Sequence, residues 1–463
     1  MLLRSRTELA TLYNTFNAET IFAVGDIDTE TYNAYEAQLL SLCNIRTDTR
    51  TTRRYVGHGI ASHVIGYVGQ ISAEALERLE GQGYQEGDLV GFSGIEETYE
   101  AQLAGEPERF LQVTDPEGIV LRELAGTPGT QPQSVTLTLD LELQWAAAQA
   151  LNDAYNYAAT NWASPVHSPG GGVVVLDVDT GAVLAMASYP SFDPGIFGPD
   201  TPIFLVGDYI SQLTSDTRRP FLNRVAQNSY APGSTFKIVT LAAAAEERLW
   251  NPDELFYCGM EWQGQAFGDT QPVRLDWRAT ENLEENRFAT GDVSMAEALM
   301  ASCNPFFYQM GAQLFNTRGA SMLVDYARRM GFGRNTGFNT TLPEVAGQLP
   351  EIRSVEQSIN TAIGQDDTQV TILQMARMMA ALGNGGTLYR PYVVQQVGRG
   401  EGGEPSFVAQ PQVEGQLNLS DSTMALLQEA MCNVTLQERV GRSTGAVGAL
   451  GVACLTFVMN ETG

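Results

Sequence analysis

Ser234 and Lys237 are the residues of this chain whose types and spacing best suit covalent chemistry. Of the 27 basic residues, 26 are arginine, so Lys237 is the only lysine. Arginine keeps its proton near neutral pH, whereas a buried lysine gives it up readily. Residues three apart on a helix share one face. The pair therefore places an amine that could act as a base beside a hydroxyl that could attack.

The residues around Lys237 favour a buried position. S-x-x-K spacing is a weak signal by itself, and its ordinary alternative is a surface lysine on a helix. Apolar residues flank this lysine on both sides, however, and the helix predicted over 234–247 is rich in alanine. A helix that is apolar nearly all round is buried. At its N-terminus Ser234 would meet the positive end of the helix dipole, and its N–H could form half of an oxyanion hole.

A second candidate group is the triplet Ser302-Cys303-Asn304, which lies 68 residues after Ser234. Taken alone, it is best explained as a helix cap or loop, the usual place for serine and asparagine. Together with Ser234 and Lys237 it suggests a partner set. A second hydroxyl can relay a proton to a leaving amine, and an amide can bind a substrate carbonyl.

Helices and a β-sheet that begins with a hairpin are predicted to position these residues. Apolar runs at 173–177 and 182–187 flank an Asp-Thr-Gly turn, which is a hairpin signature. Helices are expected over 141–157, 294–300, 305–314 and 371–382, and a strand over 135–139. Earlier in the chain we expect helix and turn up to about residue 50, a strand over 60–68, and short helices over 72–80 and 99–103. The fold class is therefore α+β.

A cluster of proline, glycine and threonine at residues 127–132 predicts a domain boundary. A chain of 463 residues exceeds one ordinary domain. We expect an N-terminal domain over residues 1–134 and a second domain over residues 135–463 that carries the candidate groups.

Composition excludes several classes of function. A net charge of −27 argues against nucleic acid and anionic lipid as partners. The cysteines are odd in number and lack CxxC spacing, which argues against a zinc site and a disulfide framework: Cys43, Cys258, Cys303, Cys432 and Cys454. The histidines His58, His63 and His167 fit no metal motif. No GxSxG precedes a suitable helix, so a Ser–His–Asp hydrolase is poorly supported.

No run of about 18 apolar residues occurs, and no signal peptide opens the chain. The sequence therefore predicts either a cytoplasmic protein or a fragment whose membrane anchor lies upstream.

With these motifs in place, the chain resembles the class B penicillin-binding proteins, the peptidoglycan D,D-transpeptidases of cell elongation and division. Combining S-x-x-K with an S-x-N triplet is typical of penicillin-binding proteins. The resemblance covers nearly the whole length, in the order that the family has. It rests on Arg54-Tyr55, His63–Gly69, Gly91–Glu96, Leu137–Asp140 with Gln144, Ala185–Pro194, Tyr230–Lys237, Ser302–Phe307, Ala362–Gln365, Thr371–Ala376 and Asn384–Gly386.

The resemblance implies a pedestal domain followed by a transpeptidase domain, with an antiparallel sheet flanked by helices. It implies that Ser234 is the nucleophile, Lys237 the general base of acylation, Ser302 a proton carrier to the leaving amine, and Asn304 a holder of the acyl-side amide. Stem peptides of peptidoglycan and β-lactams would be bound, and a membrane glycosyltransferase would be a partner. No metal or organic cofactor is needed. The full-length family lies at the outer face of the cytoplasmic membrane.

Two departures from the family pattern stand out. The membrane anchor is missing, and so is the KTG motif, because no lysine follows Lys237. The nearest strings are Arg442-Ser443-Thr444-Gly445 and Glu461-Thr462-Gly463. We expect the second domain to be incomplete at its C-terminus, through truncation or a disrupted frame.

Two alternatives to a transpeptidase stay open. A serine β-lactamase or β-lactam sensor would share the S-x-x-K chemistry, although the long segment before residue 135 argues against it. A catalytically impaired cell-wall scaffold would share the fold, and the missing KTG motif supports it.

Overall fold

The computed structural model of the chain describes residues 53–434 and a few positions before them. The gaps are residues 80–82, 85–86, 106–108, 115–119, 128, 162–167, 200, 253, 281–286, 339–341 and 399–403. The chain divides into two compact units, Met1–Thr52 and Arg53–Gly463. In the first, β1 (Leu2–Leu3) pairs with β2 (Gly25–Asp26) in antiparallel fashion. Most of the helix-and-turn region expected up to residue 50 lies outside the described residues, and so do Arg442–Gly445 and Glu461–Gly463.

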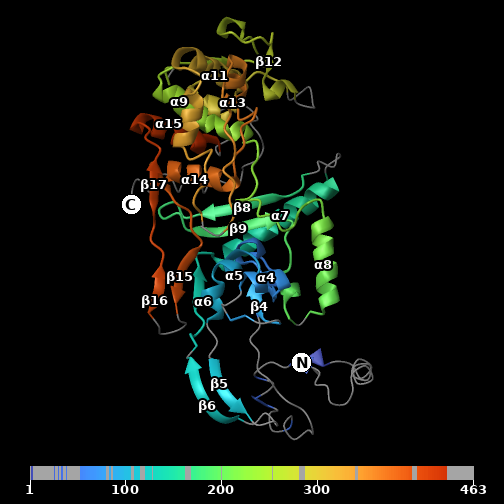
Figure 1. The fold of residues 1–463 in the computed structure, drawn as a ribbon. Helices are drawn as coiled ribbons and strands as arrows, with labels where there is room; N and C mark the ends of the chain where they lie inside the picture. Colours follow the sequence, from blue (N-terminus) through green and yellow to red (C-terminus); the bar gives the residue numbers. More distant parts are fainter. Residues whose placement is uncertain are drawn as a thin grey trace. The chain divides into compact units, whose positions relative to one another are not determined.

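The second unit begins with short helices and strand pairs (Figure 1). Its elements are η1 (Val56–His58), α3 (Ser62–Ile65), β3 (Val68–Gln70), α4 (Ala73–Arg78), β4 (Leu89–Gly91), α5 (Gly94–Thr98), α6 (Glu100–Ala104), β5 (Arg109–Thr114) and β6 (Val120–Thr127). Strand β3 pairs with β4, and β5 with β6, both antiparallel. The predicted helices at 72–80 and 99–103 are confirmed as α4 and α6. Ser72 caps α4 by accepting a hydrogen bond from the Ala75 N–H.

The strand predicted over residues 60–68 is wrong. Residues 62–65 form helix α3, and strand β3 begins only at Val68. Gly66, at φ +83°, ends the helix and turns the chain into the strand. A short apolar run fits a buried helical turn as well as a strand, so periodicity alone could not separate them.

A hairpin packed between two helices forms the centre of the following region. Strand β8 (Gly171–Leu176) pairs with β9 (Val183–Tyr189), as the sequence predicted. Val173 and Val175 pack with α7 (Leu141–Asn161), whereas Val174 and Leu176 join a cluster containing Ile372 and Leu373 at the start of α14 (Ile372–Gly383). Successive side chains of a strand point to opposite faces, so both faces of β8 are covered. Figure 1 shows α7 and α14 on the two sides of the hairpin.

The elements that pair with or extend this region come from distant parts of the chain. Strand β7 (Ser134–Leu137) is confirmed and pairs with β15 (Val394–Gly398), which pairs in turn with β16 (Pro405–Val408). Strand β14 (Thr387–Tyr389) pairs with β17 (Val413–Gln416). Two further elements, η2 (Pro194–Phe197) and α8 (Ile203–Ser215), follow the hairpin.

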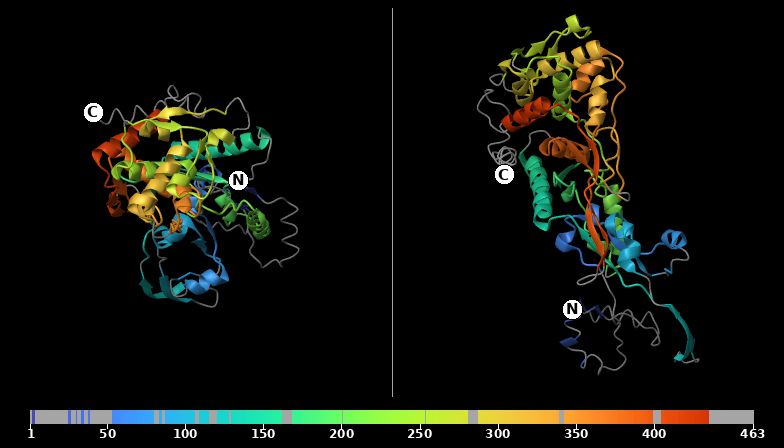
Figure 2. Two further views of the ribbon diagram at one scale, coloured as in Figure 1. Left: turned by 90° about the horizontal axis from the view of Figure 1, so that it is seen from above. Right: turned by 90° about the vertical axis from the view of Figure 1, so that its left-hand side faces the viewer.

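The largest hydrophobic core surrounds α9 (Lys237–Glu246), whose first eight residues are all buried. The rest of this region consists of η3 (Gly233–Phe236), β10 (Phe256–Cys258), β11 (Glu261–Trp262), η4 (Gln265–Phe267), β12 (Arg274–Leu275), η5 (Trp277–Thr280), β13 (Gly291–Val293), α10 (Met295–Met300), α11 (Asn304–Arg318), α12 (Met322–Arg329), α13 (Val355–Ala362) and α15 (Asp421–Val434). Figures 1 and 2 show the red helix α15 against this helical group, where it contacts α9 and α10. The predicted helices here are confirmed, and so is the α+β class.

Among the described residues, no helix combines the length and the apolar character that a membrane crossing needs.

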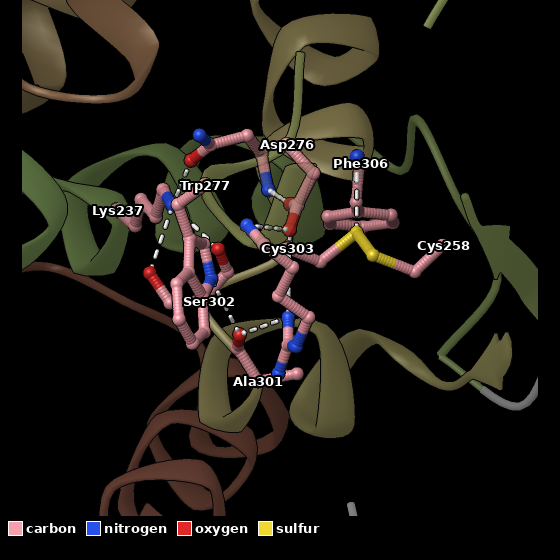
Figure 3. Close-up of a disulfide and its surroundings, with 10 residues drawn as sticks. Lys237, Cys258, Asp276, Trp277, Ala301, Ser302, Cys303 and Phe306 are labelled. Atoms are coloured by element: carbon pink, nitrogen blue, oxygen red, sulfur yellow. Dashed lines mark hydrogen bonds and ion pairs between the residues drawn. A yellow bond between two sulfur atoms is a disulfide. The ribbon is translucent and has the colours of Figure 1, made fainter. Parts of the chain in front are cut away.

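A disulfide between Cys258 and Cys303 corrects the expectation from cysteine spacing. The two Cα atoms are 6.1 Å apart although 45 residues separate them in sequence. Both cysteines are buried in the core around α9. Spacing rules detect local pairs such as CxxC, whereas this bond joins the end of β10 to the residue that caps α11 (Figure 3).

Removing this disulfide should destabilise the protein. A cross-link closing a loop of this length contributes about 2–4 kcal/mol, mainly by restricting the unfolded chain. We expect the variant carrying Cys258→Ala and Cys303→Ala to unfold at lower denaturant concentration than the wild type. Under strong reductant the two proteins should unfold nearly together. An unchanged midpoint without reductant would show that the bond contributes nothing.

Candidate active site

Ser234 is exposed on a single 3₁₀ turn, η3, that leads directly into α9. The turn is held from behind by Gly364, whose carbonyl accepts a hydrogen bond of 2.9 Å from the Gly233 N–H. Gly364 has φ +71°, and a Cβ built on it would lie 2.0 Å from the Gly233 oxygen. Only glycine fits such a contact. The N–H groups in the first turn of a helix have no partner within the helix, so the backbone at Ser234 points donors outward.

Lys237 is fully buried at the beginning of α9, in agreement with the sequence. Its Nζ donates to the Ser302 carbonyl at 2.8 Å, to Ser302 Oγ at 2.9 Å and to Asn304 Oδ1 at 2.5 Å. The ring of Phe307 lies 5.3 Å away. Burial lowers the pKa of Lys237 to about 7, against the opposing effect of the Asp276 carboxylate. The amine can therefore exist in its neutral form near physiological pH.

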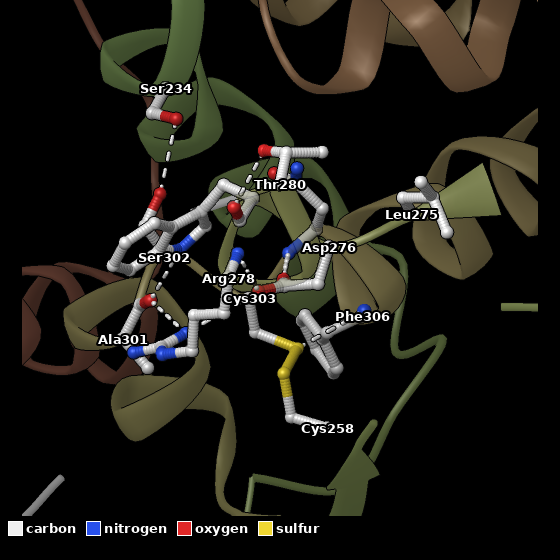
Figure 4. Close-up of polar contacts among 12 residues, drawn as sticks. Ser234, Cys258, Leu275, Asp276, Arg278, Thr280, Ala301, Ser302, Cys303 and Phe306 are labelled. Atoms are coloured by element: carbon white, nitrogen blue, oxygen red, sulfur yellow. Dashed lines mark hydrogen bonds and ion pairs between the residues drawn. A yellow bond between two sulfur atoms is a disulfide. The ribbon is translucent and has the colours of Figure 1, made fainter. Parts of the chain in front are cut away.

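Ser302 and Asn304 occupy the connection between α10 and α11, and the structure brings both to Lys237. Ser302 has φ +52°, an uncommon conformation for a residue with a side chain. Its Oγ donates to Ser234 Oγ at 3.0 Å. All four predicted residues thus meet in one cluster, part of which Figure 4 shows. The Lys237 backbone N–H donates to the Ser234 carbonyl. Within the described part of residues 53–434, however, no side-chain hydrogen bond joins Ser234 directly to Lys237, and the Ser302 hydroxyl bonds to both side chains instead.

Two charged residues beneath this cluster were not found by sequence reasoning. Asp276 and Arg278 are both buried. Asp276 Oδ2 accepts from the Asn304 N–H at 2.9 Å, and Arg278 Nη1 donates to the Ala301 carbonyl at 3.1 Å. A buried Asp-x-Arg in an irregular segment has no periodicity, so the only available signal was the rarity of buried charges.

Asp276 also lies near the disulfide. Among the described residues, one group has the composition of a metal site: Cys258, Asp276 and Cys303, whose ligand atoms lie within 4.8 Å of one another. The two sulfurs are bonded to each other. Metal coordination by cysteine requires thiolates, so the cysteines of this cluster cannot act as ligands in the disulfide form.

Comparison with known proteins places both parts of the chain. Residues 4–137 match the family described as Penicillin-binding Protein dimerisation domain, and residues 171–452 match the Penicillin binding protein transpeptidase domain. Peptidoglycan D,D-transpeptidase MrdA of Acinetobacter baumannii is 29% identical over 415 residues, covering 86% of this chain and 55% of the relative. The protein of the same name from Escherichia coli K12 is 30% identical over 358 residues, covering 74% and 51%. The chain thus spans about half the length of these curated relatives.

Solved structures share the fold. One, described as "Structural coordination of polymerization and crosslinking by a peptidoglycan synthase complex", has a TM-score of 0.73 and 28% identity, with 94% of this chain and 72% of the other covered. The complex between penicillin-binding protein PBP2 and MreC from Helicobacter pylori has a TM-score of 0.69 and 22% identity, with coverage of 93% and 74%. With the dimerisation and transpeptidase matches in this order, the chain belongs to the class B penicillin-binding protein family.

Proposed function

We propose that this chain is a serine D,D-transpeptidase that cross-links peptidoglycan stem peptides through an acyl-enzyme. The observation that carries the proposal is the hydrogen-bonded line from Ser234 Oγ through Ser302 Oγ to Lys237 Nζ. It joins an exposed hydroxyl to a buried amine whose pKa is lowered to about 7. Similar proteins are named as peptidoglycan D,D-transpeptidases, which supports the same reaction.

A count of protons gives the direction of transfer along this line. The Ser302 carbonyl and Asn304 Oδ1 can only accept hydrogen bonds. A neutral Lys237 has two N–H groups for these two acceptors, and its lone pair is then left for the Ser302 hydroxyl. With Lys237 protonated, the amine donates to Ser302 Oγ and Ser302 Oγ donates to Ser234 Oγ. In the neutral form both hydrogen bonds would reverse, so that Ser302 donates to Lys237 and accepts from Ser234. The attacking oxygen can thus lose its proton to Lys237 by way of Ser302.

The reaction follows from this relay. Ser234 Oγ bonds to the carbonyl carbon of the penultimate D-Ala, and its proton moves through Ser302 to Lys237. The same path returns the proton to the nitrogen of the terminal D-Ala as the C–N bond breaks. Asn304 would hold the acyl-side carbonyl through its amide nitrogen, and the Ser234 N–H would supply one oxyanion donor. An amine of a neighbouring stem peptide then takes the acyl group and frees Ser234.

The wider setting is proposed from the family and from the solved structures of similar proteins. β-Lactams would acylate Ser234 as substrate mimics. The solved assemblies of similar proteins include a peptidoglycan synthase complex and a complex with MreC, which supports partners in the cell-wall machinery. From the family resemblance we propose a membrane glycosyltransferase as one such partner. We place the site at the outer face of the cytoplasmic membrane.

Labelled penicillin should attach covalently to Ser234. Ser234→Ala should abolish labelling, and peptide mapping should find the label on the peptide that contains residue 234. Thr235→Ala is the matched control, since it removes the neighbouring exposed hydroxyl, whose one hydrogen bond to the described residues goes to the Pro232 carbonyl. Labelling that survives Ser234→Ala would overturn the assignment. Rapid hydrolysis of a chromogenic β-lactam in place of a lasting adduct would favour a β-lactamase.

Lys237→Arg should reduce acylation by at least about 100-fold, because arginine cannot give up its proton and a general base contributes about 10²–10⁴ in rate. In the wild type the rate should rise with pH through about 7, where Lys237 changes from its protonated to its neutral form. The measurement is the acylation rate across pH 5–9 at one ionic strength. An arginine variant of near wild-type rate would mean that Lys237 acts only as a positive charge.

We also propose that the domain boundary lies between residues 134 and 135. The pairing of β7 with β15 supports a boundary close to this position, since this pairing ties Ser134–Leu137 to a late part of the sequence. Limited proteolysis should cut between residues 128 and 132 and leave a folded C-terminal piece. If no cut in this stretch separates two folded parts, the boundary is misplaced.

A further inference from the structure

The connection between α10 and α11 carries Ser302, and two helix ends meet there. Helix α10 ends at Met300 with Ala301 as its C-cap, and α11 begins at Asn304. The last carbonyls and first N–H groups of helices lack partners within the helix. Here the Ala301 carbonyl accepts from Arg278 Nη1 at 3.1 Å and from Trp277 Nε1 at 3.4 Å. The Asn304 N–H donates to Asp276 Oδ2 at 2.9 Å.

The signs of these charges match the helix ends. A carboxylate is stabilised at the positive N-terminal end of a helix, and a guanidinium at the negative C-terminal end. Asp276 and Arg278 also pair with each other, with Nη1 and Oδ1 3.6 Å apart, and both side chains are only 1% exposed. Arg278 further lies over the ring of Trp277, 4.4 Å from its centroid. Arg278 thus binds the connection at Ala301 and Asp276 binds it at Asn304, and Ser302 and Cys303 lie between these two points (Figures 3 and 4).

We propose that Asp276 and Arg278 are positioning residues of this site: they hold the Ala301–Asn304 connection from its two ends and so keep Ser302 and Asn304 against Lys237. The mechanistic part of this inference rests on the proposed transpeptidase function. Neither residue touches the position of the reacting atoms, since each acts through the Ala301–Asn304 connection or through its field.

A purely structural role is the alternative. Asp276 Oδ1 accepts from the Arg278 N–H at 3.0 Å, which is an ordinary cap for the turn η5. Asparagine is an equally good cap. If capping were the whole role, Asp276→Asn would be nearly silent. If instead the carboxylate holds the Asn304 N–H and acts on Lys237 through its charge, Asp276→Asn removes that charge and one of the two hydrogen bonds that Asp276 accepts.

The charged groups that act on Lys237 are Asp276, which raises its pKa, and Arg278, which lowers it. The other partners of its amine are neutral: Ser302, Asn304 and the ring of Phe307. The glutamates at the far end of α9 are engaged elsewhere, Glu246 with Ser420 and Glu247 with Arg318. Neutralising Asp276 and neutralising Arg278 are therefore expected to shift the pKa of Lys237 in opposite directions.

The test uses the fact that Lys237 is the only lysine. Protein grown with lysine labelled with ¹³C at Cε gives a single side-chain signal, whose chemical shift against pH reports the pKa of Lys237 directly. We expect Asp276→Asn to lower this pKa below the wild-type value and Arg278→Gln to raise it. Loosening of the fold would admit water and raise the pKa in both variants, so a downward shift cannot come from structural damage.

A matched control lies seven residues earlier. Asp269 is buried and paired with Arg274, with Nε and Oδ2 2.6 Å apart. Within the described residues, no hydrogen bond or ion pair joins either of these two to Ser234, Lys237, Ser302 or Asn304. Asp269→Asn should destabilise the protein by a comparable amount and leave the pKa of Lys237 where it is.

Acylation by labelled penicillin supplies the second measurement. For Asp276→Asn we expect a loss of about 10-fold at the high-pH plateau, the scale of one lost hydrogen bond to a charged group. The midpoint of the rise with pH should move down with the titration of Lys237. An unmoved or raised Lys237 pKa in Asp276→Asn, or the same shift in Asp269→Asn, overturns the proposal. If the Lys237 pKa shifts as expected in the variants but the wild-type protein is not acylated by penicillin, the proposed function is contradicted. The positioning role is still supported in that case.

Discussion

Burial of the Lys237 amine is the constraint on which the rest of the site depends. Placing an ammonium group in an apolar core is costly unless it is hydrogen-bonded or loses its charge. The core around α9 does both: it lowers the pKa of the amine to about 7 and surrounds it with oxygens of Ser302 and Asn304. The helix can therefore be apolar nearly all round and still present one reactive amine to Ser234, one turn away.

The same burial explains why the connection between α10 and α11 must be held rigidly. Ser302 accepts hydrogen bonds from the lysine amine through both its carbonyl and its hydroxyl, and it does so in the left-handed conformation at φ +52°. Such a conformation costs of order 1–3 kcal/mol and persists only where the surroundings enforce it. Here the enforcement comes from three sides. The disulfide fixes Cys303, Asp276 holds the Asn304 N–H, and Arg278 holds the Ala301 carbonyl.

Sequence patterns predicted the regular parts of this arrangement because those parts follow local rules. The alanine-rich helix after Ser234, the hairpin around Asp179-Thr180-Gly181, and the apolar helix that follows Thr371 were all predicted from periodicity and from turn residues. The meeting of Ser234, Lys237, Ser302 and Asn304 was expected from residue types and family resemblance. What could not be predicted depends on tertiary packing. The Cys258–Cys303 bond spans 45 residues, and Asp276 and Arg278 lie in an irregular segment whose role appears only when two helix ends converge on it.

Opposed charges beneath the lysine have a consequence for catalysis. A general base works best when its pKa lies near the working pH, because it must be neutral often enough to accept a proton and basic enough to draw it away. Burial alone would lower the pKa of an amine well below the working pH, since the pKa of a fully buried lysine falls by up to about 3–5 units. The Asp276 carboxylate raises the pKa of Lys237 against the effect of burial, and the Arg278 guanidinium lowers it again in part. An unpaired carboxylate near an amine favours the ammonium form, so Asp276 acting alone would hold the pKa of Lys237 higher. Because its nearest charged partner is Arg278, the carboxylate is neutralised locally, and Lys237 remains able to lose its proton and to regain it from Ser234.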